Sequence, residues 1–452
     1  MSSFIVGRSR EFRIQQLREL NLRGRLSITD LQNIENPLDA SEADLKNKTL
    51  ELHLQWDWWN RNAIDSTKEG EDFLPFLKYL NICHLDGIVS IDADFHGNNS
   101  SSFKSLETLE FRFMQEWEKW ECQTVTGAFP HLQRLYIKSC PKLKGHLPEP
   151  LVPLKKVEIS DCQQLEASAP GALDLRLHSS GKIQFDWATL KELWFGGHNM
   201  EAWLMEMVGH IVSDTSLEKL EIYSCSDCPI CNDFGSLSIF LLDFFPKLKR
   251  LNLSDFHNLK MISLGLGGLR FLEFFYIGRC PQFESLPENM HMLLPSLTEL
   301  YISNCPRLES FPGGGLPSNL KVVTLNNCTR LIGSLKGALG DNSSLESLYI
   351  ENVNAECFPE EGLLPLSLTT LCIADCPNLK ELDYKGLCQI SSLKKLLIGN
   401  CPNLQNFPEE GLPKSISHLT IEGNCPLLKQ RFQVSECQDW GKVAHIESFI
   451  IH

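Results

Sequence analysis

The sequence has little that would carry the chain across or into a membrane. Its first apolar run, Phe4 to Val6, is three residues long, whereas a secretory signal needs about 7–15 apolar residues. No stretch reaches the roughly 18 uninterrupted apolar residues of a membrane span. The N-x-Ser/Thr sequons at Asn47, Asn98 and Asn342 are then chance matches. We expect a cytoplasmic protein whose 17 cysteines are reduced thiols.

Motifs for catalysis and for binding nucleotide phosphates are also missing. The chain has no G-x-x-x-x-G-K-[ST] phosphate loop, no G-x-S-x-G nucleophile motif and no H-E-x-x-H zinc motif. Its formal net charge of −15 argues against binding the nucleic-acid backbone, which needs a basic surface. We therefore predict that the chain is not an enzyme, holds no cofactor or metal ion and binds no nucleic acid.

Two groups of residues leave a chemical alternative open. The segment "CSDCPIC", with Cys225, Cys228 and Cys231, has the C-x-x-C spacing that suits zinc. No second Cys/His pair follows at zinc-finger spacing, and Cys225 falls on a structural position of the repeat described next. A repeat with a local insertion is therefore the favoured interpretation. Asp92 and Asp94 have strand spacing, and we predict that they are surface charges.

One motif recurs along almost the whole chain. The pattern L-x-x-L-x-L/I-x-x-C/N-x-x-L is clear in "LTELYISNCPRL" from Leu297 and in "LTTLCIADCPNL" from Leu368. The repeats step by 25 residues from Leu272 to Leu297 and by 23 residues from Leu393 to Ile416. A period of 20–29 residues with this pattern is the signature of leucine-rich repeats. The repeats that we recognise begin at Leu77, Leu106, Leu132, Leu154, Leu190, Leu217, Leu248, Leu272, Leu297, Leu320, Leu345, Leu368, Leu393 and Ile416.

Each position of the repeat has a structural reason. The central L-x-L alternates inward and outward, as a short strand does. One repeat cannot bury its apolar residues alone, so repeats stack and their strands form a parallel sheet. The cysteine fits a tight inward bend. We predict an α/β leucine-rich-repeat solenoid, a curved horseshoe with a parallel β-sheet on its concave face and mostly irregular loops and short helical turns on its convex face. The cysteines predicted to pack in this core are Cys140, Cys162, Cys280, Cys305, Cys328, Cys376 and Cys401.

The repeats predict a single solenoid over residues 1–452. N-terminal repeats occupy 1–56, a polar surface loop follows at 57–72, and the main repeat array covers 73–429. The remaining residues, 430–452, break the pattern and are predicted to cap the solenoid.

Two irregularities refine this plan. The step of 36 residues between Leu154 and Leu190 allows either a long loop or one degenerate repeat near "DLRLHSSGKI". In the second half of the chain, a Phe-Pro pair recurs at Phe311, Phe358 and Phe407, in every second repeat. The convex loops are therefore expected to alternate between two shapes.

Two sets of surface residues are candidates for protein binding. One outward side chain lies between the two inward residues of each strand, and exposed aromatic residues there are favoured interface anchors. The alternative is that they only cover neighbouring side chains. The aromatic candidates are Tyr136, Trp194, Tyr276, Tyr301 and Tyr349.

The second set is a basic N-terminal stretch in an otherwise acidic chain. It is either a solvated face or a docking surface for an acidic partner. Its residues are Arg8, Arg10, Arg13, Arg18, Arg23 and Arg25.

The two ends of the chain resemble one family. The segment "FIVGRSREFRIQQLRELNLRGRLSITDLQNIENPLDASEADLKNK", residues 4–48, is similar to the middle of the repeat region of plant disease-resistance proteins. These are nucleotide-binding leucine-rich-repeat receptors of the coiled-coil class, or NLRs. The segment "CPLLKQRFQVSECQDWGKVAHIESFIIH", residues 425–452, resembles their C-terminus, and the Cys-Pro repeats between the two segments match the same class.

The resemblance implies a sensing and autoinhibitory region of an innate-immune receptor. Such a region recognises a pathogen effector or a guarded host protein in the defence response. Family members begin with a coiled coil and an NB-ARC switch domain, and neither is in this sequence. The resemblance therefore implies a member truncated at its N-terminus, and ADP or ATP would belong to the missing domain.

On this view the arginines face an NB-ARC domain and the concave aromatic residues face the effector. The alternative is a free-standing cytosolic repeat scaffold or decoy from a truncated resistance gene. An extracellular receptor ectodomain is a third possibility, and only the sequons favour it.

Overall fold

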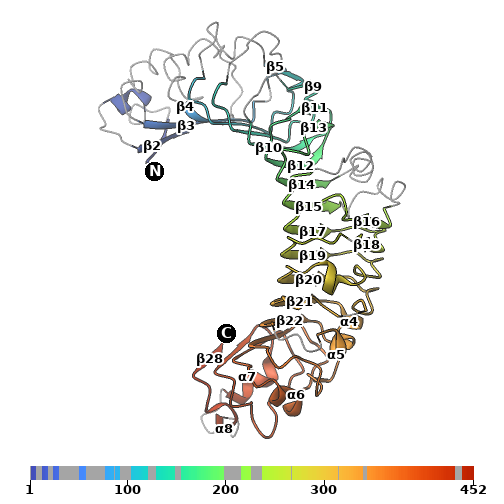
Figure 1. Ribbon diagram of the computed structural model, residues 1–452. Coiled ribbons are helices and arrows are strands. Elements are labelled where there is room, and N and C mark those ends of the chain that lie inside the picture. The colour runs from blue at the N-terminus through green and yellow to red at the C-terminus, as the bar shows by residue number, and fades with distance from the viewer. Residues whose placement is uncertain are drawn as a thin grey trace. The chain divides into compact units, whose positions relative to one another are not determined.

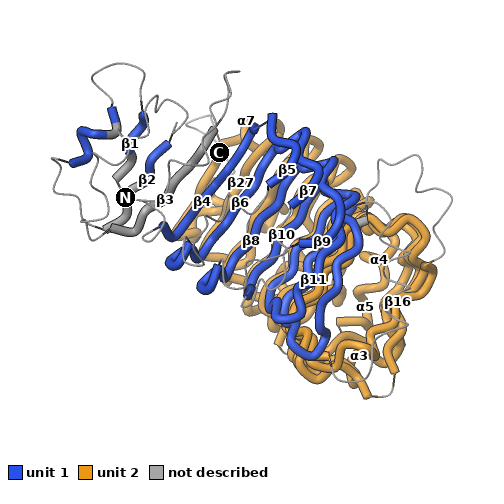
Figure 2. Tube along the Cα trace, turned by 90° about the horizontal axis from the view of Figure 1, so that it is seen from above, with its two compact units in different colours: residues 1–199 blue, residues 200–452 orange. Residues whose placement is uncertain are grey.

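The computed structural model describes the chain in two compact units, Met1–Asn199 and Met200–His452 (Figure 2). Each unit is built from coils that contribute one strand to a parallel sheet and return through loops on the other side. The described residues are 2–6, 13–18, 24–29, 50–57, 77–85, 87–91, 103–120, 129–147, 154–197, 215–224, 237–265, 267–313, 315–339, 344–432 and 440–452.

The main sheet of unit 1 is parallel, and each strand pairs with the strand of the next coil (Figure 1). Of the two alternatives near "DLRLHSSGKI", the degenerate repeat is confirmed, because Asp174–Ser180 forms a strand that pairs with the strands of the repeats at Leu154 and Leu190. The strands are β1 (Ser2–Ile5), β2 (Gly24–Thr29), β3 (Leu50–Asp57), β4 (Leu77–Cys83), β6 (Thr108–Arg112), β8 (Arg134–Lys138), β10 (Lys156–Cys162), β12 (Asp174–Ser180) and β14 (Glu192–Gly197).

Unit 2 repeats the same arrangement with a more regular step. Its strands also pair in parallel with those of the next coil. They are β15 (Lys219–Ser224), β17 (Arg250–Ser254), β19 (Phe274–Gly278), β20 (Glu299–Ser303), β21 (Val322–Asn326), β22 (Ser347–Glu351), β24 (Thr370–Ala374), β26 (Lys395–Gly399), β27 (His418–Glu422) and β28 (Ser448–Ile451).

The inward residues of the strands form the core of both units. Leu300 and Ile302 of β20 are fully buried and pair in register with Val323 and Leu325 of β21. Because the side-chain period of a strand is two, this register places every L-x-L pair on the same face. Burying one such leucine contributes about 1.5–3 kcal/mol. The stacked rows confirm the predicted α/β leucine-rich-repeat solenoid.

Short elements lie on the side opposite the main sheets, as predicted. In unit 1 they are the strands β5 (Ser90–Ile91), β7 (Lys119–Trp120), β9 (Gly145–His146), β11 (Leu165–Ser168) and β13 (Ile183–Gln184), and the 3-10 helix η2 (Ile14–Arg18) precedes β2. In unit 2 they include β16 (Ile239–Leu241), β18 (Met261–Ser263), β23 (Cys357–Phe358), β25 (Glu381–Leu382), α3 (Met290–Leu293), α4 (Thr329–Gly333), α5 (Leu335–Ala338), α6 (Tyr384–Gln389), α7 (Pro426–Phe432) and α8 (Trp440–Val443).

The loops of unit 2 alternate between two shapes. Coils with a Phe-Pro pair alternate with coils that carry a short helix: α3, then α4 and α5, then α6, then α7. The backbone N–H of Leu269 donates to the carbonyl of Leu293 at the end of α3, at 2.8 Å, and Leu316 donates to Ala338 at the end of α5, at 3.1 Å. The helix-bearing coil therefore hydrogen-bonds to the coil before it, and the alternation predicted from the Phe-Pro pairs is confirmed.

A left-handed residue turns the chain at the end of most strands. In unit 2 these residues are largely Asn or Asp, which tolerate a positive φ. Asn327 has φ 51°, donates to Asn304 Oδ1 at 2.8 Å and accepts from Asn352 Nδ2 at 2.6 Å. Asn400 donates to Asp375 Oδ1 at 3.0 Å in the same way. We call Asn304, Asn327 and Asn352 the asparagine ladder.

The cysteine of each repeat follows directly after this turn. All seven predicted packing cysteines are at most 1% exposed. Their thiols bond to the carbonyl two residues earlier, for example Cys376 to Ala374 at 3.0 Å. Cys376 Sγ also accepts the backbone N–H of Val353 in the preceding coil, at 3.3 Å. The small thiol therefore satisfies buried backbone groups at the bend, as the repeat pattern predicted.

The C-terminal segment adds one more strand to unit 2. β28 pairs with β27, and Phe432, Trp440 and Phe449 pack against one another with ring centroids 5.1–5.8 Å apart. The role of residues 430–452 as a cap stays a prediction. The predicted boundaries of the N-terminal repeats, the surface loop and the main repeat array also stay predictions. Most of the predicted loop 57–72 lies outside the described residues. None of the helices described is long and apolar enough to cross a membrane.

Candidate protein-interaction surface

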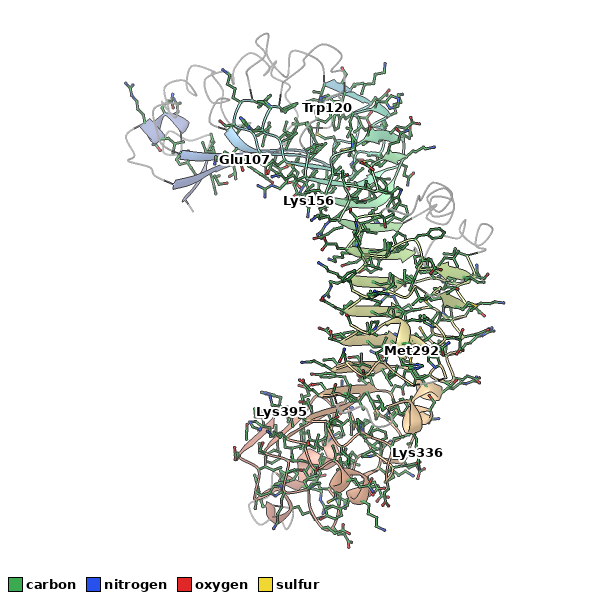
Figure 3. The ribbon with its side chains drawn as sticks, viewed as in Figure 1. Glu107, Trp120, Lys156, Met292, Lys336 and Lys395 are labelled. Atoms are coloured by element: carbon green, nitrogen blue, oxygen red, sulfur yellow. The ribbon has the colours of Figure 1, made fainter. Side chains whose placement is uncertain are left out.

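The outward side chains of the strands form a solvent-facing surface on each main sheet, which we call the open face. In unit 1, Lys156 points from β10 onto the open face (Figure 3). In unit 2, Lys395 of β26 lies on it, whereas Met292 and Lys336 lie on the opposite side with the short helices (Figure 3). All five predicted aromatic residues lie on an open face and are partly exposed.

The open face of unit 1 is a lattice of paired charges. Lys138 Nζ lies 2.5 Å from Glu158 Oε1, and Lys156 Nζ lies 2.8 Å from Asp174 Oδ2. Arg176 Nε also contacts Asp174, at 3.2 Å. Burial opposes the charge of Arg176, yet its carboxylate neighbours raise the pKa of its guanidinium. Acidic and basic side chains on this face thus neutralise one another.

One carboxylate of this face is buried. Glu110 of β6 is 3% exposed, accepts a hydrogen bond from the Tyr79 hydroxyl and pairs with Arg112 Nε at 2.5 Å. Burial and the Glu110 carboxylate together raise the pKa of Tyr79 above its ordinary value. Thr108 beside it accepts from Arg134 Nε at 3.0 Å. These groups hold one another in place.

The two aromatic candidates of unit 1 are separated. Tyr136 lies on β8 and Trp194 on β14, with Glu158 and Arg176 between them in register. Lys138 lies over the Tyr136 ring at 5.4 Å, and His178 lies 5.8 Å from the Trp194 ring. Charged side chains therefore separate the two rings.

The aromatic candidates of unit 2 are closer together. Tyr276 and Tyr301 are direct neighbours in register on β19 and β20. Tyr349 lies two strands further on, with Thr324 between it and Tyr301. The Tyr301 ring also lies 5.1 Å from Phe274, and burial followed by Glu299 raises the pKa of the Tyr301 hydroxyl. Phe274 occupies the outward position two residues before Tyr276 on β19, so the central outward positions alone do not reveal it.

Two arginines, Arg250 and Arg279, lie at the β17–β19 end of the cluster formed by Phe274, Tyr276 and Tyr301. Arg250 lies 4.1 Å from the centroid of Phe274, a cation–π contact. Arg279 forms a two-point ion pair with Asp255 at 2.6 and 2.7 Å, and that hydrogen-bonded carboxylate raises the pKa of the guanidinium.

The sequence reasoning also missed an acidic edge on the same face. Glu351, Asp375 and Glu422 lie at the carboxyl ends of β22, β24 and β27. Glu351 and Glu422 occupy the outward position two residues after the central one, and Asp375 follows its strand directly. That second outward position, compared along the repeats, is the signal that would have found the two glutamates.

The N-terminal arginines are only partly within the described structure. Arg13 precedes η2 and Arg18 ends it, and both are exposed, whereas Leu17 between them is fully buried. Arg8, Arg10 and Arg23 and the side chain of Arg25 lie outside the described residues. Docking through this set stays a prediction.

The cysteines weighed as a zinc site, Cys225, Cys228 and Cys231, lie outside the described residues. So do Asp92 and Asp94, whose role as surface charges stays a prediction. Where side chains are described, no cluster of three or more His, Cys, Asp or Glu residues has a geometry that would hold a metal ion.

Comparison with known proteins agrees with the geometry of the repeats. The family model for R13L1/DRL21 LRRs matches residues 14–140. The putative disease resistance protein At3g14460 of Arabidopsis thaliana is 31% identical over 342 residues, which cover 68% of this chain and 22% of that protein. The putative disease resistance RPP13-like protein 1 of the same plant is 26% identical, over 36% of this chain and 22% of that protein.

A third relative comes from Solanum bulbocastanum. Its putative disease resistance protein RGA1 is 32% identical, over 30% of this chain and 13% of that protein. The matches thus span about a fifth or less of each relative's length. The repeats, the family match and these relatives confirm the predicted resemblance: the chain is a leucine-rich-repeat region of the kind found in plant disease-resistance proteins.

Proposed function

We propose that this chain is the sensing region of a plant innate-immune receptor, which recognises a pathogen effector or a guarded host protein by protein–protein binding. The observation that carries the proposal is the row of partly exposed tyrosines on the open face of unit 2. Tyr276 and Tyr301 stand side by side in register, and Tyr349 continues their row. Partly exposed aromatic side chains on a rigid sheet lose little conformational entropy on binding and are favoured interface anchors.

The relatives support the same role. Their printed names describe disease resistance, and the chain matches about a fifth or less of each of them. On this proposal an NB-ARC domain, with its ADP or ATP, is a further partner, and the exposed Arg13 and Arg18 favour the N-terminal arginines as its docking surface. Tyr136 and Trp194 are proposed secondary contacts, because charged neighbours surround them. The protein would then act in the cytoplasm.

A two-hybrid screen of the full chain against a library of pathogen effectors and host proteins tests the proposal. Binders should lose at least about a hundredfold in affinity with Tyr276→Ala/Tyr301→Ala/Tyr349→Ala, because interface aromatics each contribute about 2 kcal/mol or more. The matched control is Tyr136→Ala/Trp194→Ala, which should cost about tenfold or less. Circular dichroism checks that both variants fold. Partners that bind the triple tyrosine variant as tightly as the parent chain would refute the proposal.

A free-standing scaffold or decoy is the alternative function. It would bind the same partners without any association with an NB-ARC domain. Co-precipitation of the chain with such a domain from a close relative, with and without residues 1–25, separates the two. Association that depends on the segment favours the receptor.

A further inference from the structure

The open face of unit 2 carries carboxylates that no described cation neutralises. Among the described residues, Glu351, Asp375 and Glu422 take part in no ion pair with a lysine or arginine. The Lys429 ammonium donates to the carbonyls of Gly423 and His452, beside Glu422, without forming an ion pair with it, whereas Lys395 lies at the amino end of β26, four residues before Gly399. At about 3.3 Å per residue, that places its backbone about 13 Å from the acidic edge.

Small residues separate the two glutamates. The register aligns Glu351, Ala374, Gly399 and Glu422 on four neighbouring strands. With strands about 4.8 Å apart, the glutamates are about 14 Å apart along the sheet. Glu422 leans over Gly399, because a Cβ placed there would lie 3.4 Å from Glu422 Cγ. Gly399 is itself buried beneath Glu422, so a partner side chain would reach the exposed oxygens of the carboxylates rather than the space over Gly399.

The negative charge at this edge contributes to raised pKa values of Glu351 and Cys372. Burial and then Asp375 raise the pKa of Glu351. Burial also raises the pKa of Cys372 to about 11, and Glu351, Glu422 and Asp375 add to this rise. Asp375 itself accepts a hydrogen bond from a neutral amide, that of Asn400, at 3.0 Å. A cation brought to this edge would relieve the repulsion among the three carboxylates.

The acidic edge continues the tyrosine row. Tyr349 and Glu351 lie on the same strand, two residues apart and on the same face. From β19 to β27 the surface thus changes from aromatic to acidic over six strand spacings, or about 29 Å. An extended segment of about nine residues spans that length. Tyrosine faces also attract cations, so the two parts favour the same partner chemistry.

We propose that the open face of unit 2 binds a basic protein segment. Its lysine or arginine side chains would pair with Glu351, Asp375 and Glu422 along the acidic edge, and its apolar or aromatic residues would lie on the tyrosine row. The inference rests on the proposed function, since it specifies the partner of the same surface. On the open face of unit 1, by contrast, Glu158 and Asp174 are each paired with a lysine.

A selection from a display library of random peptides of about nine residues, with the full chain as bait, tests this inference. Peptides that bind the parent chain should be enriched in lysine and arginine and should bind about tenfold more weakly to Glu351→Gln/Asp375→Asn/Glu422→Gln. The matched control is Glu360→Gln/Glu409→Gln/Glu410→Gln, which removes the same charge from exposed loops outside the main sheet. The control should bind as the parent does.

Each other outcome has a defined meaning. If both triple variants weaken binding equally, the attraction is to net charge and the inference is wrong. If the selected peptides are not basic but still need Tyr276, Tyr301 and Tyr349, the inference is wrong and the proposed function stands. If they need neither the tyrosines nor the carboxylates, both fail.

Discussion

The two open faces are built on the same repeat and differ in how their charges are balanced. In unit 1, Glu158 and Asp174 each lie within 2.8 Å of a lysine ammonium. In unit 2, the described residues leave Glu351 and Glu422 without such a partner. The stacked strands fix the position of each outward side chain. The residues on the neighbouring strands decide whether a charged side chain there has an ion-pair partner within the same face. An unpaired carboxylate gains more than a paired one from a cationic partner.

The turns after the strands show a second contrast. In unit 2 the asparagine ladder joins three successive turns through side-chain amides. In unit 1 the equivalent left-handed positions hold His84, Phe113, Ser139, Asp161 and Ser179. Serine and phenylalanine adopt a positive φ less readily than asparagine. The turns of unit 2 therefore stabilise its sheet in a way that the described turns of unit 1 do not match.

The largest expected effect of a single substitution lies in the charged lattice of unit 1. Glu110→Ala leaves the Tyr79 hydroxyl and the Arg112 guanidinium without their buried acceptor. We expect a loss of about 2 kcal/mol in the free energy of unfolding, because two hydrogen bonds to a charged carboxylate are lost, while water can still reach the partly exposed Tyr79 and Arg112. Chemical denaturation monitored by circular dichroism measures it.

The comparison supplies the control. Glu422→Ala removes a carboxylate that has no described ion pair, so the free energy of unfolding should change by less than about 0.5 kcal/mol. Equal losses for Glu110→Ala and Glu422→Ala would mean that the two faces do not differ as described.

A smaller effect is expected at the asparagine ladder. Asn327→Ala removes two amide hydrogen bonds and places alanine at φ 51°. We expect a cost of about 1–2 kcal/mol, measured by thermal unfolding. Asn327→Gly keeps the left-handed turn and loses only the bonds, so it should cost less.

Ser139→Ala in unit 1 is the corresponding control. It places alanine at a similar φ, 53°, without removing a ladder amide. It should therefore destabilise the chain by less than Asn327→Ala does. A larger cost for Ser139→Ala would show that the ladder does not distinguish the two units.

The sequence predicted most of the fold, because a fixed spacing of leucines and cysteines leaves few ways to bury them. It predicted the strands, the packing cysteines and the alternating loops. It did not predict Asn327 as part of a ladder, since the bond to Asn304 exists only after residues 23 positions apart are stacked.

The candidate surface was predicted less completely. The aromatic residues were found because each strand has one central outward position. The acidic edge was not found, because Glu351 and Glu422 become neighbours of Ala374 and Gly399 only through the register of four strands. Charge balance on a sheet depends on such cross-strand neighbours rather than on local sequence.

Hydroxyl-radical footprinting of the full chain, with and without a binder from the two-hybrid screen, tests the central claim most directly. It reports the exposure of individual side chains. We predict that the binder protects Tyr276, Tyr301 and Tyr349 and leaves the labelling of Tyr136 nearly unchanged. Protection of Tyr136 with no change at the three tyrosines of unit 2 would contradict the account.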